Sequence, residues 1–469
     1  MIEYLDAFLI CLYFFTLAAL FWKKEKIDTI LDFSLHKRAF SAVALFFTII
    51  ATMIGGTGFV KKLNLFYTDG WLYLIPNLGV VIQMLIFCLF IIPRAEKILG
   101  YPTVSSFIGA HYGQKMRWIA AMSSSIGVSG FIASQCKVMG MTGHAFIPII
   151  PENIINFMTL LLITFYCYNG GIRHVIITDI LQALCFFVTF ISLLYYLWPN
   201  PEQAINITQT HDLTKYSFFT AFNNASIEEI QSMLLLLFYF AIPIFTSSQF
   251  QRIAIARNKS QLYKSWWAST FFMFFATIIP CYISYYVFLQ NPDLSQNQVL
   301  SYVINLLDVP GLKAITIIGI FAMAMSTIDS HINTAACNLA NDFIKMNSLS
   351  AMEKVTWARV YTIIIALFSY GLMLLEGNFL RLVLLASSFY MPIITLPLFA
   401  AIFDIKLTER NVISSAIITF SVTLVAQILK YNNIIIMDPL MPCFLLNLTL
   451  LTFNYFIDKY ILFINTKSS

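Results

Sequence analysis

The sequence T-I-I-A-T-M-I-G-G-T-G-F-V, residues 48–60, decides how this chain folds. It begins as an apolar helical run and then places Gly55 and Gly56 side by side, with a third glycine two residues later. Glycine inside a helix costs about 1 kcal/mol per residue relative to alanine, so we expect the helix to break here. A second break is predicted in F-A-I-P-I-F-T-S-S-Q-F-Q-R, residues 240–252. There Pro243 lacks a backbone donor, and the following Thr-Ser-Ser-Gln cluster can bind the freed backbone groups.

The composition of the 469-residue chain indicates a lipid bilayer as its surroundings. Hydrophobic residues make up 59% and charged residues 11%, against roughly 25% charged residues in an ordinary soluble domain. No basic tract with interleaved aromatic residues is present, which excludes nucleic acid as an expected partner. The eight cysteines lie singly in apolar runs and indicate packing rather than metal binding. The acidic start M-I-E-Y-L-D has no basic region before its apolar run, so a cleaved signal peptide is not expected.

Apolar runs of roughly 20 residues predict an all-α integral membrane protein with about thirteen transmembrane helices. Their approximate ranges are 4–22, 41–60, 71–92, 118–147, 153–168, 174–198, 232–249, 265–289, 311–337, 355–375, 379–403, 411–429 and 442–463. If the N-terminus is outside, most of the 28 Lys and Arg fall in inner loops, as the positive-inside rule requires. The C-terminus is then cytoplasmic. The many Ile, Phe and Asn residues are typical of an AT-rich bacterial genome, which predicts a plasma (inner) membrane.

The two predicted breaks occupy matching positions. If residues 41–198 and 232–403 are two repeats of five helices, each break falls in the first helix of its repeat. Because five is odd, the second repeat is inverted. Residues 1–22 and 411–463 are then peripheral helices of a single transmembrane domain. Close packing or a kink would explain either break alone. The matching positions favour discontinuous helices around a midplane site, as in alternating-access transporters.

The strongest polar pattern is I-F-A-M-A-M-S-T-I-D-S-H-I-N-T-A-A-C-N, residues 320–338. Its polar residues, among them Ser326 and Ser330, recur at spacings of three and four and therefore share one helix face. Asp329 adds a carboxylate, which costs about 2.5–3.5 kcal/mol at the centre of a transmembrane helix. A partner, an ion or a water-filled cavity is therefore expected beside it. His331 is more typical of a packing residue than of a ligand.

Two further charges lie inside predicted transmembrane helices. Asp179, in H-V-I-I-T-D-I-L-Q, is equally consistent with pairing to Arg173 at the inner interface and with a role on an ion pathway. Lys137 lies in the middle of its helix, so we expect it to line the bundle interior. A carboxylate is its expected partner, and Asp329 and Asp179 are the candidates.

Three stretches resemble the sodium/solute symporter family, whose members share the inverted-repeat fold of the leucine transporter. They are A-T-M-I-G-G-T-G-F at 51–59, G-G-I-R-H-V-I-I-T-D-I-L-Q at 170–182, and A-M-S-T-I-D-S at 324–330, which N-D-F follows at 341–343. The resemblance implies a secondary active transporter rather than an enzyme. The implied activity is Na⁺-coupled uptake of a small polar organic solute by alternating access.

The resemblance also implies where the ion and the solute bind. An unwound helix exposes carbonyl oxygens, and hard cations prefer oxygen ligands. The implied Na⁺ ligands are the carbonyls of Ala51, Ile54 and Met323 and the hydroxyls of Ser326 and Thr327. The implied ion-pathway residues are Asp179, Asp329 and Ser330. The predicted solute contacts are Gly55, Gly56, Thr57, Asn77, Ser247, Ser248 and Gln249.

The chain departs from the family pattern at several charged positions. Lys61 and Lys62 stand where the family often has small residues, and they are predicted to end the second span at the outer interface. Met53 stands where some members have a carboxylate, and Lys137 adds a fixed charge in a core helix. These departures leave the coupling ion and its stoichiometry open.

Two other functions stay open from the sequence. One is a solute sensor built on a transporter fold, although such chains usually continue into a soluble output domain after the last span. The other is a membrane-embedded transferase that uses His331 with Asn333 or Asp329. No paired nucleophile or metal motif accompanies that histidine. The sequence indicates no oligomeric state.

Overall fold

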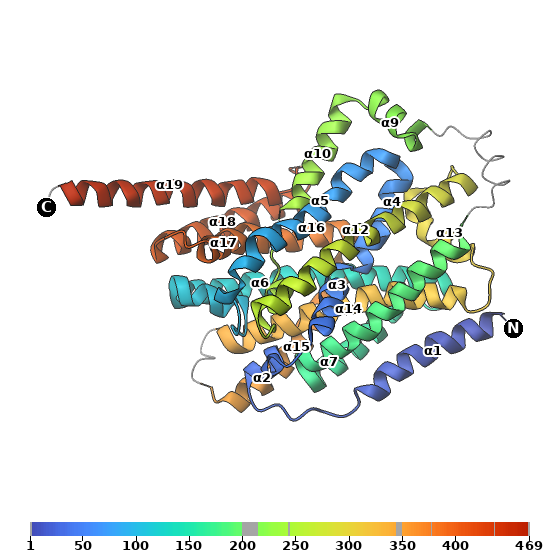
Figure 1. Ribbon diagram of the computed structural model, residues 1–469, viewed down its shortest axis with the longest axis horizontal. Coiled ribbons are helices and arrows are strands. Elements are labelled where there is room, and N and C mark those ends of the chain that lie inside the picture. Colours follow the sequence, from blue (N-terminus) through green and yellow to red (C-terminus); the bar gives the residue numbers. More distant parts are fainter. Residues whose placement is uncertain are drawn as a thin grey trace.

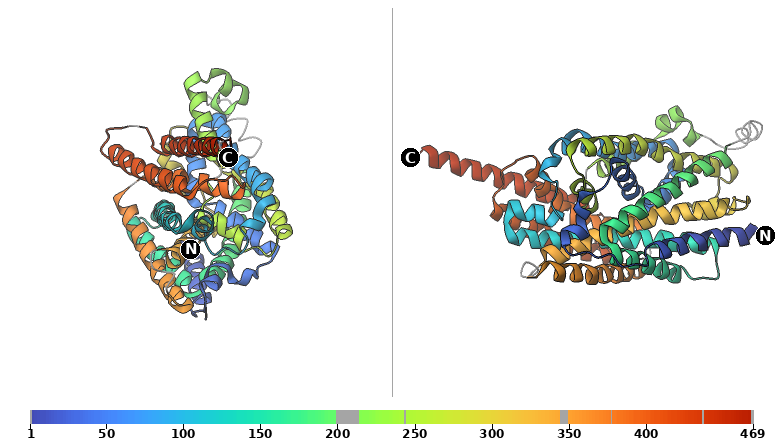
Figure 2. Two further views of the ribbon diagram at one scale, coloured as in Figure 1. Left: turned by 90° about the vertical axis from the view of Figure 1, so that its left-hand side faces the viewer. Right: turned by 60° about the horizontal axis from the view of Figure 1, so that its bottom comes forward.

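The computed structural model describes residues 2–198, 214–242, 244–343, 349–376, 378–435 and 437–467. These residues form helices and connecting turns, and none of them lies in a β-strand. The long helices form a bundle that the two termini leave at opposite ends (Figures 1 and 2).

The first half of the chain contains the first broken helix and the two longest helices. Its helices are α1 (Ile2–Leu20), α2 (Ile30–Leu35), η1 (His36–Arg38), α3 (Ala42–Met53), α4 (Gly56–Asp69), η2 (Gly70–Tyr73), α5 (Leu74–Ile86), η3 (Phe87–Ile91), η4 (Ile92–Lys97), α6 (Val104–Phe146) and α7 (Glu152–Tyr196). The turn η3 is a π-helix, and η1, η2 and η4 are 3₁₀-helices.

The second half contains the second broken helix and the buried central helix α14. Its helices are η5 (Thr214–Tyr216), α9 (Phe218–Asn224), α10 (Ile227–Ala241), α11 (Ser247–Ala254), α12 (Lys259–Gln290), η6 (Gln296–Gln298), α13 (Val299–Asn305), α14 (Leu312–Asp342), α15 (Ala351–Leu375), α16 (Phe379–Tyr390), η8 (Met391–Thr395), α17 (Leu396–Ile402), α18 (Glu409–Tyr431) and α19 (Leu440–Lys467).

Both helix breaks that the sequence predicts are present. Between α3 and α4, Ile54 has φ −96° and ψ 82°, and Gly55 has the extended values φ −86° and ψ 150°. The second break separates α10 from α11 and contains Phe245 with φ 52°. Pro243, on which that prediction rested, lies outside the described residues.

Nine helices among the described residues are long and apolar enough to cross a membrane, and two apolar helices, Tyr4–Leu20 and Ala42–Met53, are shorter. The difference from the predicted thirteen has local causes. The predicted spans 153–168 and 174–198 are the two parts of α7, which meet at a kink where Gly171 has a non-helical φ of 52°, and they count as one long helix here. The predicted span 232–249 is divided between α10 and α11, so neither half reaches the length of a full crossing.

One predicted boundary was wrong because hydropathy alone does not mark helix ends. Helix α4 continues to Asp69, so Lys61 and Lys62 lie inside it rather than at its end. Helix α6 begins at Val104, but its backbone is non-helical at Tyr112 and Gly113, so a short first part precedes the continuous run that contains the predicted span 118–147. Thr103 caps its first turn by accepting a hydrogen bond from the backbone N–H of Ser106 at 3.0 Å.

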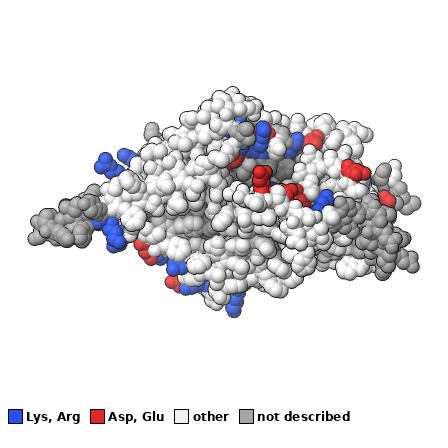
Figure 3. Space-filling model, turned by 90° about the horizontal axis from the view of Figure 1, so that it is seen from above, with Lys and Arg blue, Asp and Glu red and all other residues white. Residues whose placement is uncertain are grey.

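Helix α14 is the centre of the bundle and packs mainly against α6 and α7. Its residues from Phe321 to Asp342 are all buried. The outer helices instead expose large apolar side chains, such as Phe15, Leu375 and Phe453. In Figure 3 most of the visible surface carries no charge, and charged side chains gather near the two ends and around one hollow. This distribution suits a protein surrounded by lipid.

Candidate functional site

The two helix breaks lie against each other in the interior. The side chain of Gln249, on α11, reaches the end of α3, where its Nε2 lies 3.0 Å from the Sδ of Met53. On the other side of the first break, α14 contributes the hydroxyl of Ser326, which donates to the carbonyl of Ala51 at 2.9 Å. The site is therefore built from two discontinuous helices and the central helix.

The predicted sodium ligands come together at this point. Ser326 Oγ lies 3.1 Å from the Met323 carbonyl oxygen, and Thr327 Oγ1 donates to the same oxygen at 3.1 Å. An ideal Cβ built on Gly55 would stand 3.0 Å from Thr327 Oγ1, so that hydroxyl faces the break. Ile54 is the first residue after α3 and lies within the break. Neutral oxygens of this kind are ligands that hard cations prefer.

Side chains hold the broken backbone open. In a continuous helix the N–H of Thr57 would donate to the carbonyl of Met53. Here that N–H donates to Gln135 Oε1, on α6, at 3.0 Å, and the Ala51 carbonyl accepts from Ser326. The break is thus a fixed feature with side-chain partners, and it leaves carbonyl oxygens without their helical donors.

The predicted solute contacts of the first break divide into two groups. Gly56 packs tightly on α14, because an added Cβ would stand 3.1 Å from Ala324 Cβ, so it serves helix packing. Thr57 and Gly55 instead face α6. Thr57 Oγ1 donates to Ser134 Oγ at 3.4 Å, and a Cβ on Gly55 would stand 2.8 Å from the Nε2 of Gln135.

The predicted contacts of the second break are all buried at the start of α11. Ser248 Oγ lies 3.4 Å from Nδ1 of His331, and Ser247 Oγ accepts from Asn338 Nδ2 at 3.5 Å. Gln249 accepts from the backbone N–H of Thr246 at 2.8 Å through its Oε1, which leaves its Nε2 for the first break. These residues join α11 to the polar face of α14.

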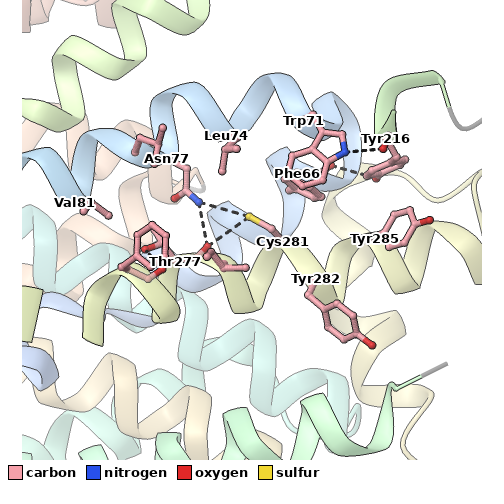
Figure 4. A pocket seen from close by; sticks show the side chains of 13 residues that line it. Phe66, Trp71, Leu74, Asn77, Val81, Tyr216, Thr277, Cys281, Tyr282 and Tyr285 are labelled. Atoms are coloured by element: carbon pink, nitrogen blue, oxygen red, sulfur yellow. Dashed lines mark hydrogen bonds between the residues drawn. The ribbon is translucent and has the colours of Figure 1, made fainter. Parts of the chain in front are cut away.

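Asn77 lies apart from the other predicted solute contacts. Its Nδ2 donates to the Thr277 carbonyl at 3.0 Å and to Cys281 Sγ at 3.5 Å, both on α12 (Figure 4). It lines a cavity of about 560 Å³ together with aromatic side chains such as Phe66 and Trp71. Its hydrogen bonds therefore belong to the contact between α5 and α12.

Asp179 binds a different arginine from the one that the sequence suggested. Its Oδ2 accepts from Arg252 Nη2 at 3.0 Å and from the hydroxyl of Thr48. Both members of the ion pair are almost completely buried, with 0% and 1% of their surfaces exposed. Arg173 instead binds Glu25. Arg173 and Asp179 both follow the bend at Gly171, at a spacing that does not place them on one helix face.

Arg252 is the residue that sequence reasoning most clearly missed. It was expected among the positive residues of an inner loop, but α11 continues to Ala254 and carries the guanidinium into the interior. Its Nε donates to Thr52 Oγ1 at 3.2 Å, its Nη1 donates to Gln251 Oε1 at 3.2 Å, and its Nη2 also binds Ser330. One buried cation therefore joins α3, α11 and α14.

The second carboxylate of this polar region is Asp329. Its Oδ2 accepts from Tyr166 OH at 2.8 Å and from Thr178 Oγ1 at 3.0 Å, and Ser330 Oγ lies 3.4 Å from its Oδ1. The Oδ1 of Asp179 and both amide atoms of Gln182 are buried without a hydrogen-bond partner. The region thus holds two buried carboxylates, and the Arg252 guanidinium pairs with one of them, Asp179.

Two other expectations about single residues have clear outcomes. Lys137 does not pair with Asp329 or Asp179: its Nζ lies 2.9 Å from Glu152, because the turn after α6 returns the start of α7 to its side. His331 stacks on Phe131 with ring centroids 5.4 Å apart. With Ser248 as its polar contact, it has the surroundings of a packing residue, as expected.

Gln135 is a second functional residue that the sequence analysis passed over. It lies in I-A-S-Q-C-K, the same stretch as Lys137, and only the lysine of this stretch was considered as a functional candidate. An amide inside a transmembrane helix is itself a signal, since it requires a partner away from lipid. Its partner is the backbone of the first break, 78 positions away in the sequence.

The family comparison matches most of the chain. The profile of the Sodium:solute symporter family covers residues 33–419, a range that includes both breaks and α14. This finding confirms the family that the three sequence stretches suggested.

Individual relatives share about a quarter of their aligned residues with this chain. The sodium/sialic acid symporter NanT of Aliivibrio fischeri is 26% identical over 339 residues, which cover 68% of this chain and 66% of that protein. The chain thus spans just under two thirds of that relative. SiaT of Proteus mirabilis, also a sodium/sialic acid symporter, is 25% identical over 342 residues, 69% of this chain and 68% of SiaT. A solved structure of a Na⁺-coupled sialic acid symporter in a substrate-bound outward-open state matches this chain with a TM-score of 0.77. The match covers 97% of this chain and 98% of that one, with 18% sequence identity. This likeness shows that the two proteins share a fold.

Proposed function

The chain belongs to the sodium:solute symporter family, and from that premise we propose that it couples Na⁺ influx to the uptake of a small polar organic solute by alternating access. The driving force is sufficient for uptake. One charge that crosses 100 mV releases about 2.3 kcal/mol. A tenfold sodium gradient adds about 1.4 kcal/mol.

The observation that carries the proposal is the contact of Ser326 with the carbonyl of Ala51 across the first break. With Met323, Thr327 and Ile54 these residues supply five oxygens for one Na⁺. No side-chain charge is needed among them, because the α3 carbonyl dipoles and the hydroxyls stabilise a monovalent cation. Asp179, Asp329 and Ser330 lie inward of this group and form the proposed path by which Na⁺ leaves.

The proposed solute site lies beside the sodium site, where the two breaks meet. Thr57, Gln135, Ser248 and Gln249 place hydroxyl and amide groups there. These groups suit a solute with several hydrogen-bonding atoms. Two relatives are named sodium/sialic acid symporters, and sialic acid is a solute of this kind.

The proposed topology has thirteen spans, with the N-terminus outside and the C-terminus in the cytoplasm of a plasma membrane. The proposed repeats are residues 41–198 and 232–403, and residues 1–22 and 411–463 are peripheral. The breaks between α3 and α4 and between α10 and α11 support the repeats. The positions of the termini at opposite ends of the bundle support the odd number of spans.

The test of the proposed function is sodium-dependent uptake by Thr327→Ala in proteoliposomes. Loss of one oxygen ligand is expected to raise the sodium concentration for half-maximal uptake by roughly tenfold or more. Thr316→Ala is the matched control, because Thr316 is also buried on α14 but its hydroxyl donates only to Leu312 of the same helix, at 3.0 Å. An unchanged sodium dependence in Thr327→Ala would refute the site. Solute counterflow separates a carrier from a sensor or a transferase, since only a carrier exchanges solute in both directions.

A further inference from the structure

Two lysines in the outer half of the first broken helix are not used by the proposed sodium site. Lys61 and Lys62 lie on α4, whose first residue is Gly56, and both are partly buried. A charged side chain inside a membrane segment is costly, and it is found where it meets a partner, a cavity or water. The surroundings of these two ammonium groups therefore indicate what they bind.

Neither lysine has a carboxylate partner among the described residues. No Asp or Glu oxygen there lies within 4.0 Å of either Nζ, whereas Lys137, the other lysine inside a core helix, is paired with Glu152 at 2.9 Å. The nearest polar side chain along α4 is Asn64, a neutral amide whose Oδ1 is buried without a hydrogen-bond partner, and the N–H and hydroxyl of Thr57 are bound to α6. The two positive charges therefore stay uncompensated on the proposed solute path.

Lys61 lies between the outer halves of the two broken helices. Its Nζ is 4.5 Å from the ring centroid of Phe240, on α10. Phe240 is held in place by α5, because an added Cβ on Gly79 would stand 2.7 Å from Phe240 Cβ. The aromatic ring attracts the ammonium but accepts no conventional hydrogen bond from it, so the N–H donors of Lys61 stay available.

Open space adjoins the two lysines. Gly58 is exposed although it follows the break in the middle of the bundle, and no atom lies within 4 Å of the position that its Cβ would occupy. Residues three and four apart lie on one helix face, so Gly58, Lys61 and Lys62 border the same space. The start of α4 at the break adds a partial positive charge at the inner end of this face.

We propose that the transported solute carries a carboxylate or a similar oxyanion and that Lys61 binds this group between α4 and α10. This inference rests on the proposed function and specifies its solute class. A compact ammonium with free donors and no carboxylate partner among the described residues forms strong charge-assisted hydrogen bonds to an oxyanion. Lys62, on the same face, adds to the positive potential that draws the anion into the path.

The test uses thermal stabilisation of the purified full chain in saturating Na⁺. The probes are acids and their uncharged amides or methyl esters: lactate, gluconate, glucuronate and N-acetylneuraminate, each beside its neutral form. At least one acid is expected to raise the melting temperature while its neutral form does not. Lys61→Gln is expected to weaken binding of that acid by roughly 10- to 100-fold, and Lys61→Arg to retain most of it. Lys137→Gln, the same change at a paired lysine, is the matched control and should leave the affinity unchanged.

Stabilisation by Na⁺ alone keeps this test separate from the test of the proposed function. Lys61→Gln should still be stabilised by Na⁺, which shows that it is folded, whereas Thr327→Ala should lose that stabilisation. The inference is overturned if a neutral form binds as well as its acid, if Lys61→Gln binds the acid as wild type does, or if no acid stabilises a protein that Na⁺ stabilises.

Discussion

Replacement of Arg252 by glutamine is expected to destabilise the protein strongly, because it leaves a buried carboxylate without its counter-ion. Arg252 Nη2 and Asp179 Oδ2 are 3.0 Å apart, and both side chains are buried. With an effective dielectric constant of about 20, two unit charges at this distance attract by about 5.5 kcal/mol. Desolvation of both ions opposes this attraction. Removal of one partner from a buried pair typically costs 3–5 kcal/mol, which is the expected loss for Arg252→Gln.

The double variant Asp179→Asn with Arg252→Gln separates the ion pair from simple loss of packing. With both charges removed, no ion is left unpaired, so the double variant is expected to be more stable than Arg252→Gln alone. The coupling free energy from the double-mutant cycle is expected to be about 3 kcal/mol. Unfolding in mixed SDS micelles, followed by tryptophan fluorescence, measures each change in the free energy of unfolding.

Arg257→Gln is the control for this series. Arg257 also lies near the end of the second broken helix, but it is exposed and its contacts are hydrogen bonds to backbone carbonyls, such as that of Arg38 at 3.3 Å. Its loss should cost about 1 kcal/mol. Two outcomes would show that the buried pair does not hold α7 and α11 together. One is that the effects of Asp179→Asn and Arg252→Gln on the free energy of unfolding add up. The other is that Arg252→Gln is as stable as Arg257→Gln.

Three further substitutions test the fold. Gly171→Ala is expected to cost at least 1–2 kcal/mol, since φ is 52° and the new Cβ would stand 2.8 Å from the carbonyl oxygen of Phe33. Gly371→Ala, in a helix with no atom within 4 Å of the new Cβ, should be neutral or stabilising in the same unfolding assay. Lys137→Met should change the free energy of unfolding by no more than about 1 kcal/mol, because Lys137 and Glu152 are both partly exposed and the pair is screened. A larger loss in Lys137→Met would show that this pair is structural.

Local sequence signals identified the discontinuous helices well. A break at Gly55 follows from the intrinsic cost of glycine in a helix, and a break before Ser247 follows from a cluster that can bind freed backbone groups. The hydroxyls of Ser326 and Thr327 were identified from the resemblance of A-M-S-T-I-D-S to the family's Ser-Thr pair, and helical periodicity places Ser326 on the polar face of a helix too polar for lipid. Each of these signals comes from a few consecutive residues, so it can be recognised without the tertiary structure.

Pairing between distant charges was predicted poorly. Pairing with Arg173 was one of two interpretations of Asp179, and Lys137 was expected to meet Asp329 or Asp179. Which partner a buried charge meets depends on where helices end and how they pack. The extension of α11 to Ala254 places Arg252 in the interior, where it meets Asp179. That extension is not encoded by the charged residues themselves.

The sequence by itself determined that this chain is a helical membrane protein of the sodium:solute symporter family and that two of its helices are interrupted. Hydropathy, helix propensity and helical periodicity act over short stretches, so they can be read from the order of residues. Only the tertiary structure decided that Ser326 meets Ala51 beside the break, that Arg252 lies buried beside Asp179, and that Lys61 has no carboxylate partner among the described residues. These contacts join segments that are far apart in the chain, and helix packing sets them through the angles and lengths of whole helices.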